Sequence, residues 1–370
     1  MKNPLDAISI PIEHLKSELK SRISFIHLVS SLAPEASTNL EAKSDLNQTG
    51  AWIDTASEGE LRAKAEAVIG LLDKLVKESQ KRLPPKGDWR HIAAEHWQIL
   101  SAKAFSFSNG ISYGWLAERF DCSRLNIPAD MPYHARIGVG HHAGNAAIEE
   151  DFLLRDAFFM LAKCQASLTR LENFRSELKT ASLAKSHYKL VSMFNQNVAT
   201  YARYAVVGFY SFVECFVNSV GEDFIARNPT LPADKRELLR GKKDGRHLAL
   251  GKKLEVFPGI IRADGKRPMV LSDPKQISEP FRSFASQVKD VRDSSAHFAK
   301  YKADIIVSPQ TWEKRAQEAS AVCSGVARGF WNACYPDRSL PLYLGKLDDA
   351  LHMQLAEQRA KTEMKELQTQ

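Results

Sequence analysis

The chain has 370 residues, of which 44% are hydrophobic and 26% charged, and its formal net charge is +7. This composition excludes an intrinsically disordered or collagen-like chain, because enough apolar residues are present to build a large core. The length predicts two domains or one large helical domain. The modest positive charge is compatible with a polyanionic partner without establishing one.

Apolar residues recur at three- and four-residue steps in the N-terminal half, a pattern typical of amphipathic helices. Ser57 and Glu60 match a capping box, in which two side chains satisfy free amides at the start of a helix. The polar stretch 34–50 predicts a loop, and residues 108–145, with scattered Gly, Pro and aromatic residues, predict turns and a small hairpin. We therefore expect residues 1–145 to be a helical and irregular region of unknown role, with helices over residues 10–32, 57–83 and 88–107.

The C-terminal half has a stronger helical pattern and almost no alternation of period two, so we expect a mainly α fold. The expected organisation is a helical domain over residues 146–345, interrupted by a basic insertion at 229–274, and then a charged helical tail at 346–370. The predicted helices of the domain span residues 147–178, 187–227, 279–297 and 312–330.

The helix after the insertion carries an apolar face formed by Phe281, Phe284, Val288 and Val291. Near its end Arg292 is followed directly by Asp293, and His297 lies five positions after the arginine. This pattern resembles the signature of the HEPN superfamily: an arginine, then four to six residues of which the first is usually Asn, Asp or His, then a histidine. The family pairs its motif helix with an earlier, long apolar helix, which Tyr201–Phe224 supplies here. The resemblance covers about residues 187–335.

The resemblance implies a metal-independent endoribonuclease that needs no cofactor and acts at the interface of two HEPN domains. It implies catalytic roles for Arg292 and His297, an orienting role for Asp293, and a supporting role for Glu214 in the middle of the family's first helix. The implied partners are RNA, a second copy of the chain, and an antitoxin or regulatory protein, as in bacterial toxin–antitoxin or antiphage systems.

Cutting RNA without a metal requires the ribose 2′-hydroxyl to attack the neighbouring phosphate. Histidine titrates near neutral pH and can act as base or acid, whereas arginine stays charged and presents a planar fork to phosphate oxygens. Five residues along an ideal helix turn through about 140°, so Arg292 and His297 need not converge within one chain. A two-fold dimer would bring two copies of each into one cleft.

The insertion between the two helices that would frame the site is rich in basic residues. Phosphate contacts supply most of the sequence-independent affinity for RNA. A solvated surface with no part in binding is the alternative interpretation of such a charge run. The residues that we expect to hold RNA are Arg236, Arg240, Lys242, Lys243 and Arg246.

Other interpretations of the chain stay open at this point. Two further arginine–histidine pairs have a compatible spacing, namely Arg90 with His96 and Arg136 with His141. A transition-metal site is another alternative, because imidazole and carboxylate ligands occur close together at His134, His141, His142, Glu149, Glu150 and Asp151. A different class of function is a non-catalytic helical module in which Arg292 and His297 bind RNA, a nucleotide or a protein.

The sequence also predicts a cytoplasmic protein that does not associate with a membrane. The start of the chain lacks the basic-then-apolar order of a signal peptide, and no apolar run approaches the length of a membrane span. The cysteines are far apart and odd in number, which predicts reduced thiols and neither a disulfide framework nor a zinc site: Cys122, Cys164, Cys215, Cys323 and Cys334.

Overall fold

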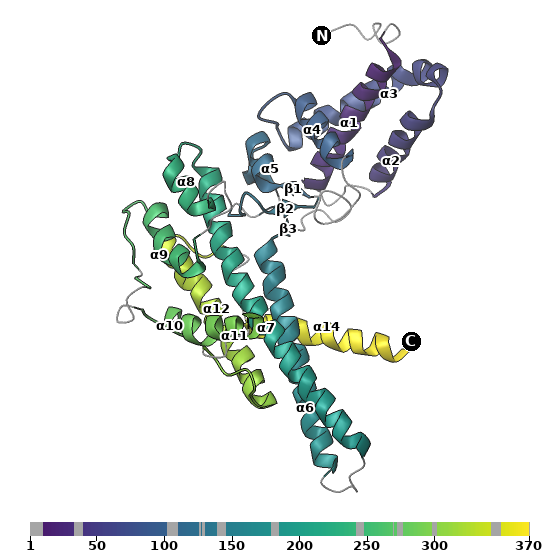
Figure 1. Ribbon diagram of the computed structural model, residues 1–370. Helices are drawn as coiled ribbons and strands as arrows, with labels where there is room; N and C mark the ends of the chain where they lie inside the picture. The colour runs from purple at the N-terminus through teal and green to yellow at the C-terminus, as the bar shows by residue number, and fades with distance from the viewer. Residues whose placement is uncertain are drawn as a thin grey trace. The chain divides into compact units, whose positions relative to one another are not determined.

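The fold is mainly α, which confirms the fold class expected from the sequence (Figure 1). The chain divides into two compact units, Met1–Ile148 and Glu149–Gln370, which are described separately. The computed structural model describes residues 10–32, 40–101, 110–125, 127, 130–138, 146–178, 185–241, 248–268, 270–271, 277–297, 302–341 and 349–369.

In the first unit, α1 is the central helix, because the other three long helices pack against it. Its side chains are buried on almost every face from Arg22 onwards. The loop predicted at residues 34–50 is wrong from Leu40, where α2 begins. Leu46 and Ile53, seven residues apart, bury one side of α2 although the stretch is polar in composition. The helices are α1 (Ile12–Leu32), α2 (Leu40–Thr55), α3 (Glu58–Arg82) and α4 (Trp89–Ser101).

The capping box predicted before α3 is confirmed. The Glu60 amide donates to the Ser57 hydroxyl at 3.4 Å, and the Ser57 amide donates to the Glu60 carboxylate at 3.0 Å. Two of the free amides at the start of α3 are therefore satisfied by side chains.

The rest of the first unit contains a small antiparallel sheet and short helical pieces. Strand order is β1-β2-β3, with Ile111 opposite Ile137 and Ile137 opposite Ala146. The hairpin predicted in this stretch corresponds to these two pairings within the described residues. The elements are β1 (Ile111–Ser112), α5 (Tyr113–Arg119), the 3₁₀ turn η3 (Cys122–Arg124), β2 (Arg136–Ile137) and β3 (Ala146–Ala147).

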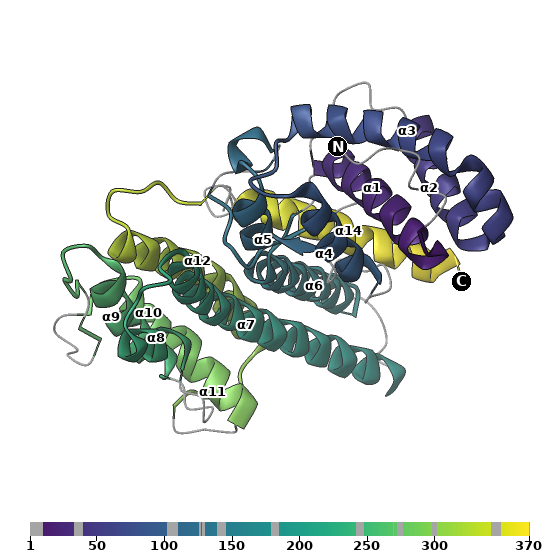
Figure 2. The same ribbon diagram turned by 90° about the horizontal axis from the view of Figure 1, so that it is seen from above.

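The second unit is built around two long antiparallel helices, α6 (Glu149–Leu178) and α7 (Lys185–Arg227), which run side by side in Figure 1 and Figure 2. They approach closely at Gly208, where a Cβ atom would lie only 2.9 Å from the Ala157 Cβ. α12 (Pro309–Cys334) packs on α7, and α14 (Asp349–Thr369) packs on α6. The core between these helices is rich in phenylalanine, including Phe158, Phe209, Phe212, Phe216 and Phe330.

α7 corrects one expectation from the sequence. By length and composition, its segment His187–Arg227 is apolar enough to cross a membrane. Of its most apolar 18-residue window, 61% is buried inside the protein, as in the core helix of a helical bundle.

The basic insertion contains two helices, α8 (Ala233–Arg240) and α9 (Leu250–Ile261). α9 is not a solvated element, because Leu250, Leu254, Phe257 and Ile261 join the core shared with α7 and α12. The insertion is therefore partly a structural layer of the second unit.

The motif helix consists of α10 (Phe281–Ser283), the π-helical segment η4 (Phe284–Lys289) and α11 (Asp290–His297). Its predicted apolar face is confirmed, since Phe281, Phe284, Val288 and Val291 are all buried. These side chains pack against α7 and α12. The polar motif starts at Arg292, directly after Val291, the last residue of this face.

Candidate functional site

Arg292 is held in place by an aromatic ring and a carboxylate. Its guanidinium carbon lies 4.1 Å from the centroid of the Tyr210 ring, and Nη1 donates to Asp293 Oδ1 at 2.8 Å. Tyr210 is itself fixed by stacking on Phe284, with ring centroids 5.5 Å apart and planes 6° from parallel. The Arg292 side chain is 25% exposed, and its other N–H groups have no acceptor among the described residues. Part of the fork is thus available to a ligand from solvent.

Asp293 is the anchor of a cationic cluster. It is only 7% exposed, and its Oδ2 accepts from Lys289 Nζ at 2.8 Å and from Lys302 Nζ at 2.6 Å. Burial alone would raise the pKa of Asp293, but the hydrogen bonds and charges of the two lysines lower it to about 2. The carboxylate therefore stays ionised near neutral pH. Three cations surround one anion, which leaves the cluster with a net charge of +2.

Ser294 brings the segment after α11 back to this cluster. Its hydroxyl is fully buried and accepts a hydrogen bond from the Ala303 amide at 3.0 Å. That bond fixes the backbone next to Lys302, whose ammonium group donates to Asp293. A serine inside the motif thus has a structural role in building the cationic cluster.

Glu214 lies on the same face of α7 as Tyr210 and Asn218, because the three residues follow at four-residue steps. Burial raises the pKa of Tyr210, the charge of Glu214 raises it further, and the charge of Arg292 lowers it. On the other side, Lys253 of α9 is 6% exposed and donates to Asn218 Oδ1 at 2.7 Å. Burial lowers the pKa of Lys253, whereas Glu214 raises it. The charge of Glu214 therefore acts both on Tyr210, the ring that contacts Arg292, and on the buried Lys253.

His297 is the last residue of α11, and its side chain lies outside the part of the structure that is described. The backbone is helical from Asp290 to His297, so the five-residue step from Arg292 corresponds to a rise of about 7.5 Å and a turn of about 140°. On one chain the two backbone positions therefore lie on different sides of the helix axis.

The residues expected to hold RNA in the insertion have mixed positions. Arg236 Nη2 donates to the carbonyls of Pro229 and Leu231 at 2.9 and 3.2 Å, so it fixes the turn before α8. Arg240 donates through Nε and Nη2 to Glu222, at 2.8 and 2.6 Å. Both arginines therefore have partners within the second unit. Lys242, Lys243 and Arg246 lie outside the described residues.

The other arginine–histidine pairs have different surroundings. His96 is fully buried, and its Nδ1 lies 2.8 Å from the Ser24 hydroxyl. Burial, assisted by the charge of His27, lowers the pKa of His96 to about 3. His96 is therefore a neutral core residue. Arg136 donates to the Gly110 carbonyl at 3.3 Å, and His141 lies outside the described residues.

Within the described ranges, no three His, Cys, Asp or Glu side chains come together to hold a metal ion. Of the candidates predicted from the sequence, His141 and His142 lie outside these ranges, and Glu150 is fully buried and accepts from the Ser219 hydroxyl at 2.9 Å. His134 is in the first unit, and Glu149 and Asp151 begin α6 in the second. All five cysteines are free, and burial raises the pKa of Cys164 and Cys215 to about 12.

Four residues of this site were missed by the sequence analysis: Tyr210, Lys253, Lys289 and Lys302. Lys289 could have been found, because it stands four residues before Asp293 on one helix, the spacing of an ion pair. The other three come from separate segments, and no local pattern connects them to the motif.

Comparison of the chain with protein-family models, curated proteins and solved structures gave no match.

Proposed function

We propose that this protein is a metal-independent endoribonuclease of the HEPN type, with its site at Arg292 and His297. The observation that carries the proposal is the fixed, partly exposed Arg292 guanidinium in a cluster of net charge +2. Such a cluster is suited to a phosphodiester, because arginine binds phosphate oxygens through two parallel N–H groups.

The reaction would proceed without an added reactant. The ribose 2′-oxygen forms a bond to phosphorus as its proton passes to a histidine, and the bond between phosphorus and the 5′-oxygen breaks. A protonated histidine returns a proton to the 5′-oxygen. The products are a 2′,3′-cyclic phosphate and a 5′-hydroxyl. Arg292 stabilises the negative charge that develops on the phosphate, and Asp293 holds Arg292 in position.

A second copy of the chain would complete the site. One imidazole cannot easily be base and acid in the same step, and positions 292 and 297 are about 140° apart around the axis of α11. A two-fold axis beside α11 would place Arg292 of each copy near His297 of the other. We propose RNA as the substrate and a cytoplasmic protein whose partner is an antitoxin or regulator, as in toxin–antitoxin and antiphage systems.

The test is incubation of a mixed-sequence RNA with the protein in EDTA, followed by analysis of the new ends. We expect cleavage with 2′,3′-cyclic phosphate and 5′-hydroxyl ends, and a loss of about a hundredfold in rate for His297→Ala. Cleavage that EDTA abolishes, or 5′-phosphate ends, would contradict the proposal. RNA binding that needs Arg292 without any cleavage would instead support the non-catalytic helical module.

A further inference from the structure

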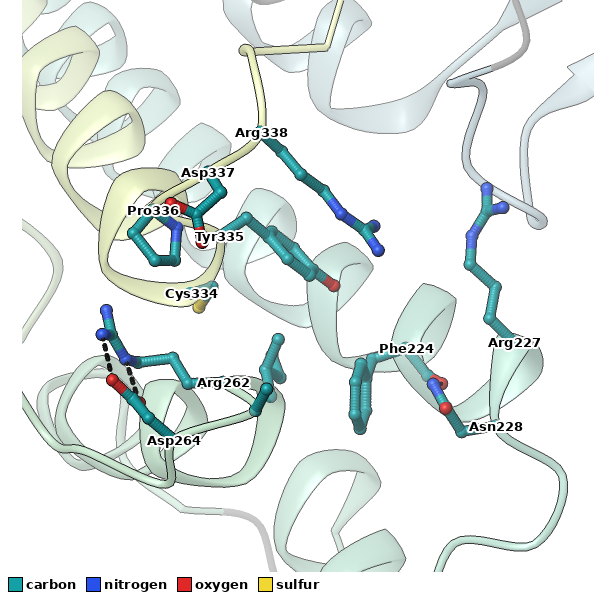
Figure 3. Close-up of a pocket in the computed structure, with 12 residues that line it drawn as sticks. Phe224, Arg227, Asn228, Arg262, Asp264, Cys334, Tyr335, Pro336, Asp337 and Arg338 are labelled. Atoms are coloured by element: carbon teal, nitrogen blue, oxygen red, sulfur yellow. Dashed lines mark hydrogen bonds and ion pairs between the residues drawn. The ribbon is translucent and has the colours of Figure 1, made fainter.

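A cavity in the C-terminal unit lies at the C-terminal end of α7. Its volume is about 670 Å³, and it is lined by the ends of α7, α9 and α12 (Figure 3). Along α7, Tyr210 and Arg227 are separated by about 25 Å, at 1.5 Å for each residue. The cavity is therefore distinct from the proposed nuclease site. Its volume is within the range of pockets that bind small organic molecules.

Part of the cavity wall is a structural cap. Arg262 forms a two-pronged ion pair with Asp264, at 2.7 and 2.6 Å, and donates to the Ala333 carbonyl at 3.2 Å. Asn228 Nδ2 donates to the Phe224 carbonyl at 2.7 Å. These contacts satisfy carbonyls near the ends of α12 and α7, and thereby offset the partial negative charge of helix C-termini. Three of the five N–H groups of Arg262 are thereby used within the protein.

The opposite part of the wall has donors without partners. Arg338 is exposed, and its guanidinium carbon lies 4.9 Å from the Tyr335 ring centroid. Among the described residues, neither the Arg338 guanidinium nor the Tyr335 hydroxyl has a hydrogen-bond acceptor. Burial raises the pKa of Tyr335, so the phenol keeps its proton and remains a donor. Figure 3 shows the Arg338 guanidinium beside the hydroxyl end of Tyr335.

The chemistry of these groups selects an anion. The Arg338 guanidinium and the Tyr335 phenol are both donors, and a phosphate monoester offers oxygens that can accept from both. Arg227 also pairs with Asp223 at 2.8 Å, so Arg338 and Tyr335 are the donors on which the argument rests. Phe224 and Ile261 add apolar surface beside them, against which a flat organic group can pack.

We propose that this cavity binds a small organic phosphate of mononucleotide size, with its phosphate on Arg338 and Tyr335 and its base against Phe224. The proposal does not depend on RNA cleavage, because it uses none of the residues around Arg292.

The test uses the full chain and adenosine 5′-monophosphate as the probe, with affinity measured by isothermal titration calorimetry. Loss of a charge-assisted hydrogen bond is worth about 1.5–3 kcal/mol, so we expect Arg338→Gln to weaken binding by about tenfold or more. Tyr335→Phe removes one neutral donor and should weaken binding by roughly two- to tenfold. Adenosine without its phosphate, and inorganic phosphate without the base, should each bind at least about tenfold more weakly than the monophosphate.

Two matched variants keep the test specific. Arg359 is also an exposed arginine on an aromatic ring, 4.1 Å from the Phe159 centroid, and Arg359→Gln should leave affinity unchanged. Arg292→Gln should also bind the probe normally, even if it loses RNA cleavage. No heat of binding into the millimolar range, unchanged affinity in Arg338→Gln, or loss of binding in Arg292→Gln would each overturn the proposal.

Discussion

Two helices of this chain carry an arginine followed by a histidine at nearly the same spacing, and their surroundings differ completely. In α4, His96 points into the core beside Ser24, whereas Arg90 stacks on Trp89 at 4.9 Å. In α11, Arg292 lies over Tyr210 within a cationic cluster. The same pair of residue types therefore has a structural role in α4, whereas in α11 the arginine is available for function.

The cause of the difference is the side of the helix that is buried. α4 packs its histidine face against α1, where Ile92, Ala93 and His96 are all buried. The motif helix packs Val288 of η4 and Val291 of α11 against the core, and Arg292, one residue after Val291, leaves from the edge of that face. A spacing rule cannot distinguish these cases unless it includes the apolar pattern around the motif.

The largest effect that would sharpen this comparison is complementation between two inactive variants. Arg292→Ala and His297→Ala should each lower cleavage by about a hundredfold or more, because each removes a group that acts in the transition state. Mixing them allows dimers in which one composite site keeps one arginine and one histidine. We expect the mixture to cleave RNA at least about tenfold faster than either variant alone. A mixture as inactive as its components would place the site within a single chain.

The next effect concerns the buried histidine and pH. The folded-state pKa of His96 is about 3, below its ordinary value of 6.5, so only the unfolded chain takes up this proton between these values. The stability that His96 provides is complete above pH 6.5 and falls by about 1.4 kcal/mol for each pH unit below it, until about pH 3. Hydrogen exchange in α1 and α4, corrected for intrinsic rates, should show this loss, and His96→Gln should flatten it. The exposed His91, changed to Gln, should leave it unaltered.

The smallest effect is expected at Asp293. Asp293→Asn keeps the side chain's size but weakens its hold on Arg292, Lys289 and Lys302, and we expect cleavage to slow by roughly threefold to tenfold with the fold retained. The pKa of Asp293 is about 2, below its ordinary 3.8, so its stabilising effect is lost only as pH falls from 3.8 towards 2. Cleavage rates between pH 5 and 8 should show no titration from this group. Asp290→Asn on the same helix is the control and should cleave normally.

Much of the fold could be predicted from the sequence, because long apolar patterns at helical spacing dominate it. The buried face of the motif helix follows from such a pattern, and the capping box at Ser57 follows from the spacing of Ser57 and Glu60. The helix α2 was not predicted, because among its described side chains only Leu46 and Ile53 are buried apolar residues. The site was predictable only within α11. Tyr210, Lys253 and Lys302 reach it through tertiary packing of three separate segments, which no local pattern contains.

The most direct measurement compares the two arginines under identical conditions. Arg292→Gln and Arg90→Gln each remove one partly accessible guanidinium that lies over an aromatic ring, at 4.1 and 4.9 Å. The cleavage rate of one RNA in EDTA should fall by about a hundredfold or more for Arg292→Gln and stay unchanged for Arg90→Gln. Equal rates for Arg292→Gln and the unaltered protein, or a loss confined to Arg90→Gln, would contradict the assignment of the site to α11.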